Sequence, residues 1–426
     1  MRRRSFRVSR LSPASLLAAL LAGACAQTGM STAPEPDAGE GGNVDDGAPG
    51  VSSSGGSSSS GTGSTSSGSG SSGAGGSDAA ADAGAAKDGP SGSPEADAGA
   101  SGWTCPAGPF PSNPIPAGAT PTRVAGVPPP DSDGGINGMG YGFSTIEGPV
   151  WVGSTLYVSE FGSQVTPPPS RILALTSSGG VTVTGPAGWN PGTNGLAVDR
   201  SGVVYGAVHG DGSISRLDLA AGMRTPIASS YPAGSGTRFN APNDLAIRSD
   251  GTIYFSDPAG FQSPNPAPQA QERVYRIAPG TNAVSVVDPQ PGVQPLNHPN
   301  GVTLSLDEKT LYVSSNSVVY AYAVNADGST GPRPSTPFST MNIDGMVIDC
   351  AGNLYGAVIG GGTVQVWSPS GATLGTLTVS GVSSVTNVAF GGADHKTLYI
   401  TAQGSGGGQQ PPGGSAQGVY QVSLLV

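Results

Sequence analysis

The sequence predicts an all-β fold, a six-bladed β-propeller over residues 103–426, and three observations carry this prediction. One phrase recurs six times, and each copy contains two apolar strands joined by a short turn. The copies follow one another at steps of 47, 49, 57, 44 and 43 residues, which suits a four-stranded blade. The strands alternate apolar and polar residues, and no stretch has the spacing of an amphipathic helix.

The strands of each copy are predicted from their composition and their boundaries. Runs such as Ser154–Phe161 and Lys309–Ser315 are rich in Val, Tyr, Thr and Leu. Short turns such as Ser249–Gly251 join the strands of a copy as hairpins. Longer Pro-rich insertions fall between strands, where loops on one face can grow at little entropic cost. We expect three insertions to shape a substrate mouth, at residues 164–170, 261–271 and 404–414.

The leading residue of each phrase is the candidate site. In a propeller the innermost strand of every blade lines the central channel, so one phase of the repeat returns at the same height around the axis. Strand interiors are depleted in Asn and Asp, so an oxygen-bearing side chain at all six places is not expected by chance. The six positions are Glu147, Asn194, Asn243, Asn300, Asp344 and Asn387.

These six residues predict a site for a divalent cation. Carboxylate and carboxamide oxygens are hard ligands, and the ring contains neither His nor Cys, so Ca²⁺ fits better than zinc or copper. Glu147 and Asp344 would balance the charge of the ion. Without a cation the two carboxylates would repel each other, which would raise at least one pKa. The alternative is that Asn-Gly pairs only reverse the chain, and it stays open for Asn194 and Asn387.

Other polar residues near the phrases have weaker signals. His209 follows the second phrase and either lines the pocket or is a turn histidine. His298 lies two residues before Asn300 and would face the same side of an extended strand, as a substrate contact or a hydrogen-bond donor to a ligand. His395 is expected in a solvated hairpin turn. Asp257 ends a strand and either walls the pocket or caps a loop.

Five phrases also resemble a known family. They are Glu147–Trp151, Arg238–Asp244, Pro299–Gly301, Asp344–Met346 and Thr386–Gly392. Together they are similar to the regucalcin/gluconolactonase family of calcium-dependent six-bladed propellers, over roughly residues 140–426. The resemblance implies that Glu147, Asn300 and Asp344 are metal ligands and that Asn243 completes the set or contacts the substrate. It also implies substrate contacts from Asn194, His209, Asn240 and His298.

The resemblance further implies an activity, the hydrolysis of a small sugar lactone or related cyclic ester. In that reaction the cation polarises the ester carbonyl and an activated water attacks it, with Asp344 as the proton acceptor. Zn²⁺, Mn²⁺ or Mg²⁺ could replace Ca²⁺ in activity assays. A monomer is expected. Nucleophilic serine catalysis is disfavoured, because no Gly-x-Ser-x-Gly elbow occurs in a strand-to-helix context.

Two other classes of function are considered beside the enzyme. One is a calcium-containing propeller that binds a ligand or partner at the cell envelope without turning it over. The other is an adhesive or structural surface protein, which would explain a long tether but not the ring. The presence of both Glu147 and Asp344 together with the Asn set favours the enzyme.

The first 102 residues predict export and a membrane anchor. Residues 1–24 combine an arginine-rich start with an apolar run that is too short to span a bilayer, and Leu21–Cys25 resembles a lipoprotein cleavage box. Cys25 would then carry acyl chains that hold the protein on a bacterial membrane, periplasmic or at the cell surface. An ordinary secretory peptide cut nearby is the alternative. Residues 25–102 are dominated by Gly, Ser, Ala and Asp and predict a flexible linker.

Charge and cysteine content limit the partners and the compartment. The five arginines of residues 1–10 leave 13 of the 18 basic side chains against 28 acidic ones, a formal charge of about −15. This charge argues against a nucleic-acid partner. Beside Cys25 the chain has Cys105 and Cys350, which could pair in an oxidising compartment or remain as two free buried thiols.

Overall fold

The computed structural model describes residues 104–124, 145–162, 170–176, 179–259, 269–404 and 417–426. The chain divides into two units after Ala83, and every described residue belongs to the second unit. The expected signal peptide, the linker and Cys25 lie outside the described residues. Within the described part, no helix is long and apolar enough to cross a bilayer.

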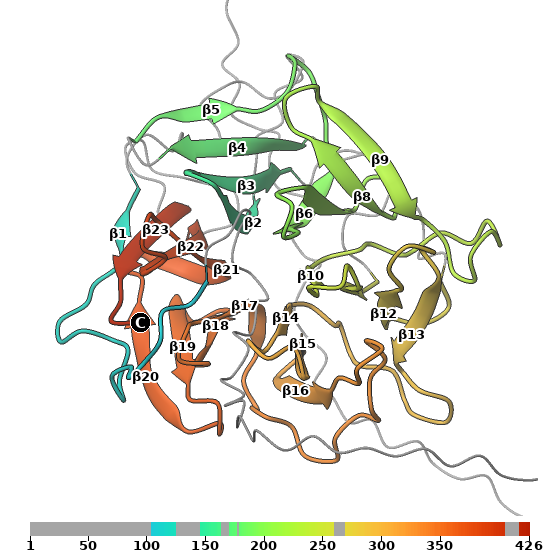
Figure 1. Cartoon of the computed structure of the whole chain (residues 1–426). Coiled ribbons are helices and arrows are strands. Elements are labelled where there is room, and N and C mark those ends of the chain that lie inside the picture. The colour runs from blue at the N-terminus through green and yellow to red at the C-terminus, as the bar shows by residue number, and fades with distance from the viewer. Residues whose placement is uncertain (1–103, 125–144, 163–169, 177–178, 260–268, 405–416) are drawn as a thin grey trace, which may run out of the picture. The chain divides into compact units, whose positions relative to one another are not determined.

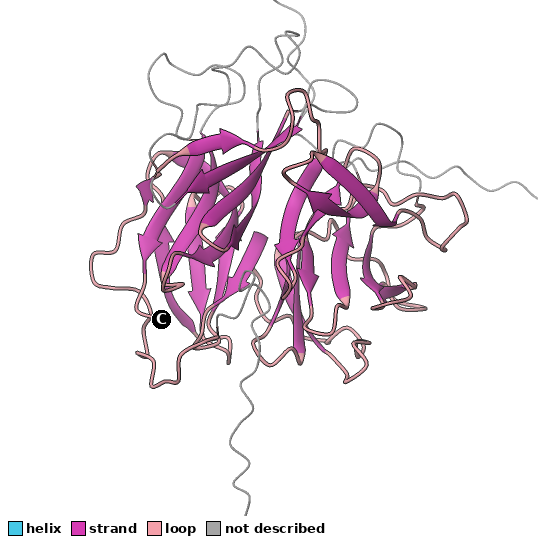
Figure 2. Cartoon of the chain, turned by 45° about the horizontal axis from the view of Figure 1, so that its top comes forward, coloured by secondary structure: helices cyan, strands magenta, loops and turns pink. Residues whose placement is uncertain are grey.

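Six antiparallel sheets surround a central axis as the blades of a propeller (Figure 1). The predicted all-β six-bladed fold is therefore confirmed. In Figure 1 the first strand of each blade lies nearest the centre, and later strands lie progressively further out. Figure 2 shows the same chain as strands and loops. Blades 1, 2, 3, 5 and 6 have four strands each, and blade 4 has three among the described residues.

The strands of the first three blades have the following bounds. Blade 1 contains β2 (Thr145–Val152), β3 (Thr155–Phe161), β4 (Ser170–Thr176) and β5 (Val181–Val183). Blade 2 contains β6 (Thr193–Val198), β7 (Val204–Val208), β8 (Ser213–Asp218) and β9 (Met223–Ala228). Blade 3 contains β10 (Leu245–Ile247), β11 (Ile253–Asp257), β12 (Arg273–Ile277) and β13 (Val284–Asp288).

The other three blades follow in the same order. Blade 4 contains β14 (Val302–Leu304), β15 (Thr310–Ser315) and β16 (Val318–Ala323). Blade 5 contains β17 (Ile343–Ile348), β18 (Leu354–Val358), β19 (Thr363–Trp367) and β20 (Thr373–Thr378). Blade 6 contains β21 (Val382–Gly391), β22 (Thr397–Gly404), β23 (Gly418–Ser423) and, at its outer edge, β1 (Thr122–Arg123).

The hydrophobic core lies between neighbouring blades, because alternate residues of the inner strands face the adjacent sheet. Tyr254 of blade 3 packs in one buried cluster with Leu311 of blade 4. Tyr355 of blade 5 packs in another cluster with Val388 of blade 6. Each such large side chain contributes about 1.5–3 kcal/mol when it is fully buried. The outer strands, such as β9, remain largely exposed.

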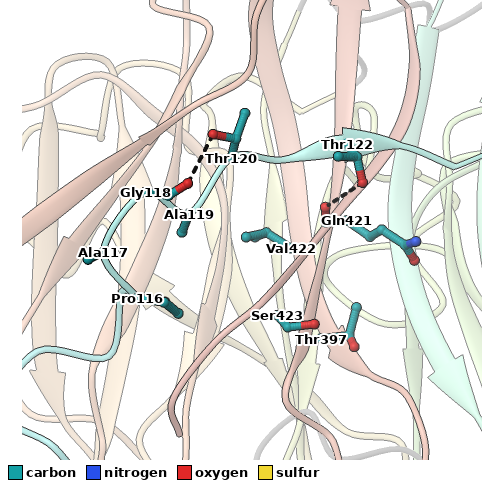
Figure 3. Close-up of a pocket in the computed structure, with 10 residues that line it drawn as sticks. All are labelled: Pro116, Ala117, Gly118, Ala119, Thr120, Thr122, Thr397, Gln421, Val422 and Ser423. Carbon is teal, nitrogen blue, oxygen red and sulfur yellow. Dashed lines mark hydrogen bonds between the residues drawn. The ribbon is translucent and has the colours of Figure 1, made fainter.

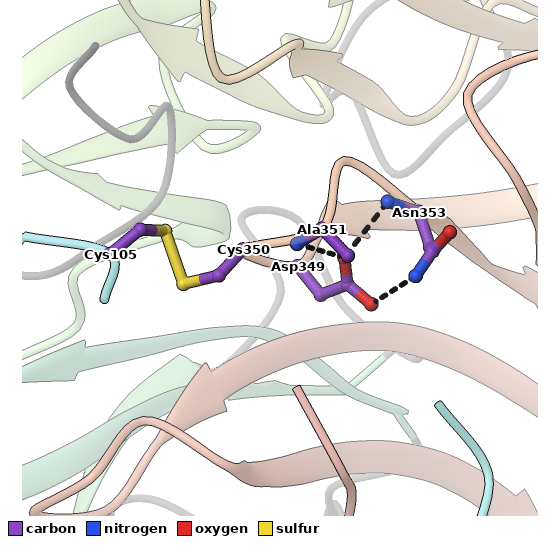
Figure 4. The surroundings of a disulfide bond; sticks show 5 residues. All are labelled: Cys105, Asp349, Cys350, Ala351 and Asn353. Atoms are coloured by element: carbon purple, nitrogen blue, oxygen red, sulfur yellow. Dashed lines mark hydrogen bonds between the residues drawn. A yellow bond between two sulfur atoms is a disulfide. The ribbon is translucent and has the colours of Figure 1, made fainter. Parts of the chain in front are cut away.

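The propeller is closed by its N-terminal segment. Strand β1 pairs with β23, so the beginning of the described chain supplies the outer strand of the last blade. Cys105 forms a disulfide with Cys350, 245 residues away, with their Cα atoms 5.4 Å apart (Figure 4). Cys350 lies in the turn between β17 and β18, where the Asp349 carboxylate accepts hydrogen bonds from the backbone. The two cysteines are thus joined and are not free thiols.

Candidate functional site

The six leading residues lie around the propeller axis. A cavity of about 10 Å³ on this axis has room for roughly one water molecule. Every blade contributes to its walls, which are Pro149, Leu196, Asp244, Leu245, Ala246, Val302, Thr303, Met346, Asn387 and Val388. Of the six leading residues, Asn387 lines this cavity, and residues one to three positions after the leading residues complete its walls.

The ring residues lie where the strand pairing is irregular. The register of β2 with β3 shifts between Glu147 and Val150, and similar shifts occur at the ring positions of β6, β17 and β21. In blades 3 and 4 the inner strand begins two residues after Asn243 and Asn300. A β-bulge redirects side chains from the ordinary alternation. Asn194 and Asn387 lie in strands, so they are not the turn pairs of the alternative interpretation.

Glycine after the ring residue lets neighbouring inner strands approach closely. A Cβ atom at Gly301 would lie 2.1 Å from the carbonyl oxygen of Asp344. A Cβ atom at Gly345 would lie 1.9 Å from the side-chain oxygen of Asn387. The recurring Gly of the phrase therefore fills a packing requirement between blades.

Hydroxyl groups on the second strands hold the backbone of the ring. Ser256 Oγ donates to the carbonyl of Asn300 over 2.5 Å, and Ser314 Oγ donates to the carbonyl of Asp344 over 3.0 Å. Each serine lies in the blade that precedes the ring residue it contacts. The positions of these two ring residues are thus fixed by the adjacent blade, which preorganises the site.

Five of the ring residues are buried, and Asp344 is partly exposed. Burial, followed by the charges of Asp344 and Asp244, raises the pKa of Glu147 well above its ordinary value. Burial and then the charge of Asp244 raise the pKa of Asp344 in the same direction, and the Asn300 side chain opposes this shift. In the described part of the chain, neither carboxylate forms an ion pair. The axis therefore brings together acidic groups that no basic side chain among the described residues balances.

Asp244 is a site residue for which the sequence analysis assigned no role. It occupies the place that glycine takes in four other blades, and its carboxylate accepts hydrogen bonds from the N–H groups of Leu245 and Val302, each over 3.0 Å. Since Val302 belongs to β14, Asp244 joins blade 3 to blade 4. Burial raises the pKa of Asp244 to about 7. The sequence signal that could have identified Asp244 is the replacement of the Gly that usually follows the leading residue of the phrase.

Asn194 and His209 form a buried pair beside the ring. The Asn194 amide nitrogen lies 3.2 Å from His209 Nε2 and donates to Asn243 Oδ1 over 3.0 Å. Asn194 Oδ1 is buried and has no hydrogen-bond partner among the residues that the structure describes. His209 lies in the turn between β7 and β8, but its side chain is only 2% exposed and meets the ring of Phe161 edge to face. Burial lowers the pKa of His209 to about 3, so its imidazole is neutral at physiological pH.

His298 lies two residues before Asn300 in a conformation that the sequence did not indicate. Its φ of 59° is left-handed, so the expected extended strand is absent there. The Glu272 carboxylate accepts hydrogen bonds from the backbone N–H of His298 over 2.7 Å and of Ala259 over 2.8 Å. The imidazole Nδ1 also lies 3.5 Å from Glu272. Glu272, which the sequence analysis missed, thus joins two loops, and the substrate contact of His298 stays a prediction.

Asn240 and Asp257 bind backbone groups. The Asp257 carboxylate accepts the N–H groups of Asn240 over 3.0 Å and Ala241 over 2.9 Å, so it caps this loop. Asn240 accepts the N–H of Gln269 over 2.9 Å, and its amide donates to backbone carbonyls. These contacts shape the loop before Asn243, while the predicted substrate contact of Asn240 stays a prediction. His395 lies in the hairpin turn between β21 and β22, as expected, and its side chain is half-buried rather than fully solvated.

A second cavity, of about 370 Å³, lies away from the axis (Figure 3). It is lined by the N-terminal segment 116–122 and by strands β22 and β23 of blade 6. Its lining residues are Pro116, Ala117, Gly118, Ala119, Thr120, Thr122, Thr397, Gln421, Val422 and Ser423. None of these side chains titrates near neutral pH, so this cavity lacks the chemistry of the axial ring.

The donor set on the axis fits a hard divalent cation. Among the described residues, Glu147 and Asp344 form no ion pair and lie close enough for the charge of Asp344 to raise the pKa of Glu147, and Asn194 of the same ring has a buried amide oxygen with no hydrogen-bond partner. Among the described residues, no three His, Cys, Asp or Glu side chains form a metal cluster by themselves. A cation bound here would therefore take amide oxygens in addition to the carboxylates Glu147 and Asp344.

The fold and this site together define a six-bladed propeller with an oxygen-lined axial centre. Residues 146–404 match the model of the SMP-30/Gluconolactonase/LRE-like region, and the chain belongs to this family. It is 29% identical to the gluconolactonase of Zymomonas mobilis over 286 residues, which are 60% of this chain and 75% of that protein. It is 34% identical to the pentonolactonase XacC of Haloferax volcanii over 187 residues, 40% of this chain and 60% of that protein.

Solved structures agree with the fold. A gluconolactonase from Xanthomonas campestris, described as important in glucose secondary metabolism, aligns with a TM-score of 0.52 and 26% identity over 75% of this chain and 98% of that protein. The calcium-binding protein regucalcin from Agrobacterium tumefaciens aligns with a TM-score of 0.51 and 18% identity, over 66% of this chain and 92% of that protein. At 18% identity the second likeness concerns the fold alone.

Proposed function

We propose that this protein hydrolyses a small lactone, a sugar lactone or a related cyclic ester, with a divalent cation held at the axial ring. The observation that carries the proposal is the pair of carboxylates, Glu147 and Asp344, that face a common axis without a basic partner. The relatives named gluconolactonase and pentonolactonase support the substrate class. Ca²⁺ is the ion that best suits a mixed set of carboxylate and amide oxygens.

Each ring residue has a separate role in this proposal. Glu147, Asn243, Asn300 and Asp344 would hold the cation. When bound, the cation supplies Lewis acidity for a substrate carbonyl. Asp344 is partly exposed while its fellow ring residues are buried, so its carboxylate is the one best placed to take a proton from an attacking water.

The proposal is tested by measuring acid release from a panel of aldonolactones and aliphatic lactones, with and without chelator, on the purified chain. Metal-dependent acid release is expected. Asp344→Asn should lower kcat by about 100-fold or more, because general-base catalysis contributes this much. Asp394→Asn, at an exposed hairpin, is the matched control and should keep wild-type turnover.

Two results would contradict the proposal. Full turnover by Asp344→Asn with metal bound would remove its role as proton acceptor. Stabilisation of the wild-type protein by Ca²⁺ with no turnover of any lactone would instead favour the binding propeller considered above.

We also propose that the protein is exported and anchored through Cys25. The disulfide between Cys105 and Cys350 supports an oxidising compartment. In a bacterial host, Cys25→Ser should move the protein from the membrane fraction to the soluble fraction, whereas Cys105→Ser should not. Equal membrane association of the Cys25→Ser protein would exclude the anchor.

A further inference from the structure

The orientation of the Asn194 side chain is the starting point. Asn194 is 3% exposed and sits in the ring between Glu147 and Asn243. Its amide nitrogen makes both contacts of the side chain, one to His209 and one to Asn243 Oδ1. An amide group has two hydrogens on nitrogen, so these two acceptors account for both of them. The carbonyl oxygen is left buried without a hydrogen-bond partner.

A buried amide oxygen without a partner loses its hydration and gains nothing in return, so such atoms are rare unless they bind something. In a ring whose other members are proposed cation ligands, an unpartnered oxygen is a further hard ligand. Asn243 Oδ1 has two lone pairs, so it can accept from Asn194 and still coordinate an ion. The ring would then supply five protein oxygens, within the range of six to eight ligands that Ca²⁺ takes with water and substrate.

His209 determines which end of the Asn194 amide faces the ring. In the tautomer that carries its proton on Nδ1, His209 Nε2 is an acceptor, and an amide turned by 180° would place its oxygen against Nε2 and against Asn243 Oδ1, so that both contacts would become repulsive. The imidazole is itself held by burial and by its edge-to-face contact with Phe161. With 2% of its surface exposed, His209 has almost no area left to contact a substrate.

We infer that His209 is a positioning residue, which holds the Asn194 amide so that Oδ1 serves as a fifth protein ligand of the axial cation. This inference rests on the proposed function, because it requires a cation at the ring. It changes the expectation for both residues, from substrate contacts to a cation ligand and the side chain that orients it. Substitution of His209 or Asn194 should therefore weaken metal binding more than substrate binding.

The test is a Ca²⁺ titration by calorimetry on the metal-stripped full chain, without substrate. His209→Leu removes the acceptor and should weaken Ca²⁺ binding about tenfold, the usual effect of losing the residue that orients a ligand. His209→Gln offers a carbonyl oxygen to the Asn194 amide and should recover most of the affinity. Asn194→Ala should weaken binding to a similar extent. His395→Leu, a half-buried histidine in a distant hairpin, is the control and should bind as the wild type does.

A double-mutant cycle separates an effect through Asn194 from an independent one. The protein with both His209→Leu and Asn194→Ala should bind Ca²⁺ no more weakly than Asn194→Ala alone. An additive loss would overturn the inference, and so would wild-type affinity in His209→Leu with a raised KM for the lactone. If the wild-type protein binds no cation, the proposed function fails as well, and this outcome differs from wild-type binding that His209→Leu leaves unchanged.

Discussion

Burial changes the pKa of single acidic residues in this propeller, and Asp257 is an example outside the ring. Its side chain is fully buried and accepts two backbone N–H groups that cap the loop before Asn243. Burial raises the pKa of Asp257 from 3.8 to about 7, although these hydrogen bonds oppose the shift. The folded protein therefore keeps this proton to a higher pH than the unfolded chain does.

This shift predicts a pH-dependent stability. Because the folded state binds the proton more tightly, Asp257 costs stability as the pH rises from about 4 to about 7. Over this range the free energy of unfolding of the wild type should therefore fall relative to that of Asp257→Asn. Denaturant titrations of both proteins at several pH values measure it, and a difference that does not change with pH would refute the raised pKa.

At the scale of elements, one side chain joins a loop of blade 3 to the loop that precedes the first strand of blade 4. Glu272 accepts the backbone N–H groups of Ala259, which follows β11, and of His298, which precedes the ring residue Asn300. Although burial works against it, hydrogen bonds from His298 hold the pKa of Glu272 below its ordinary value. The carboxylate is thus charged when it joins the loops.

Loss of this contact should loosen these two loops without removing the ring. We expect Glu272→Ala to raise KM about tenfold, the effect of losing roughly one net hydrogen bond, with a smaller change in kcat. Glu272→Gln keeps an acceptor oxygen and should recover part of the loss. Steady-state kinetics on the preferred lactone measure both values. Asp307→Ala, on an exposed hairpin, is the control, and a fall in kcat alone would contradict the assignment.

Elements were predictable from the sequence to the extent that they depend on local pattern. The recurring phrase predicted six blades, and its leading residues predicted the ring from Glu147 to Asn387, since both follow from period and position. The bulges at the ring, the bridge made by Asp244 and the pair of Asn194 with His209 were not predicted. They depend on which backbone and side-chain atoms of a neighbouring blade come within hydrogen-bond distance, and spacing along one strand does not contain that information.

At the scale of the whole molecule, the N-terminal segment holds the propeller closed. It contributes β1 to blade 6 and the disulfide to the turn after β17. This turn lies at the opposite end of β17 from Asp344, so the bond is remote from the ring. A crosslink over 245 residues reduces the conformational freedom of the unfolded chain considerably.

Removal of the disulfide should therefore affect stability and not the site. Cys105→Ser should lower the free energy of unfolding by about 2–4 kcal/mol, the usual range for a native disulfide. Its Ca²⁺ affinity should equal that of the wild type. Chemical denaturation with and without reductant measures the first quantity and calorimetry the second. Equal unfolding midpoints for wild type and variant would contradict this prediction and would show that the pairing of β1 is enough to close the propeller.

The central claim is that the inner strands deliver oxygens to a cation on the propeller axis. A crystal structure of the protein grown with Ca²⁺ tests it most directly. We expect one ion on the axis, with oxygens of Glu147, Asn300 and Asp344 at about 2.3–2.6 Å, the range usual for calcium. An axis that holds only water in such crystals, with the two carboxylates protonated or turned away from each other, would contradict it.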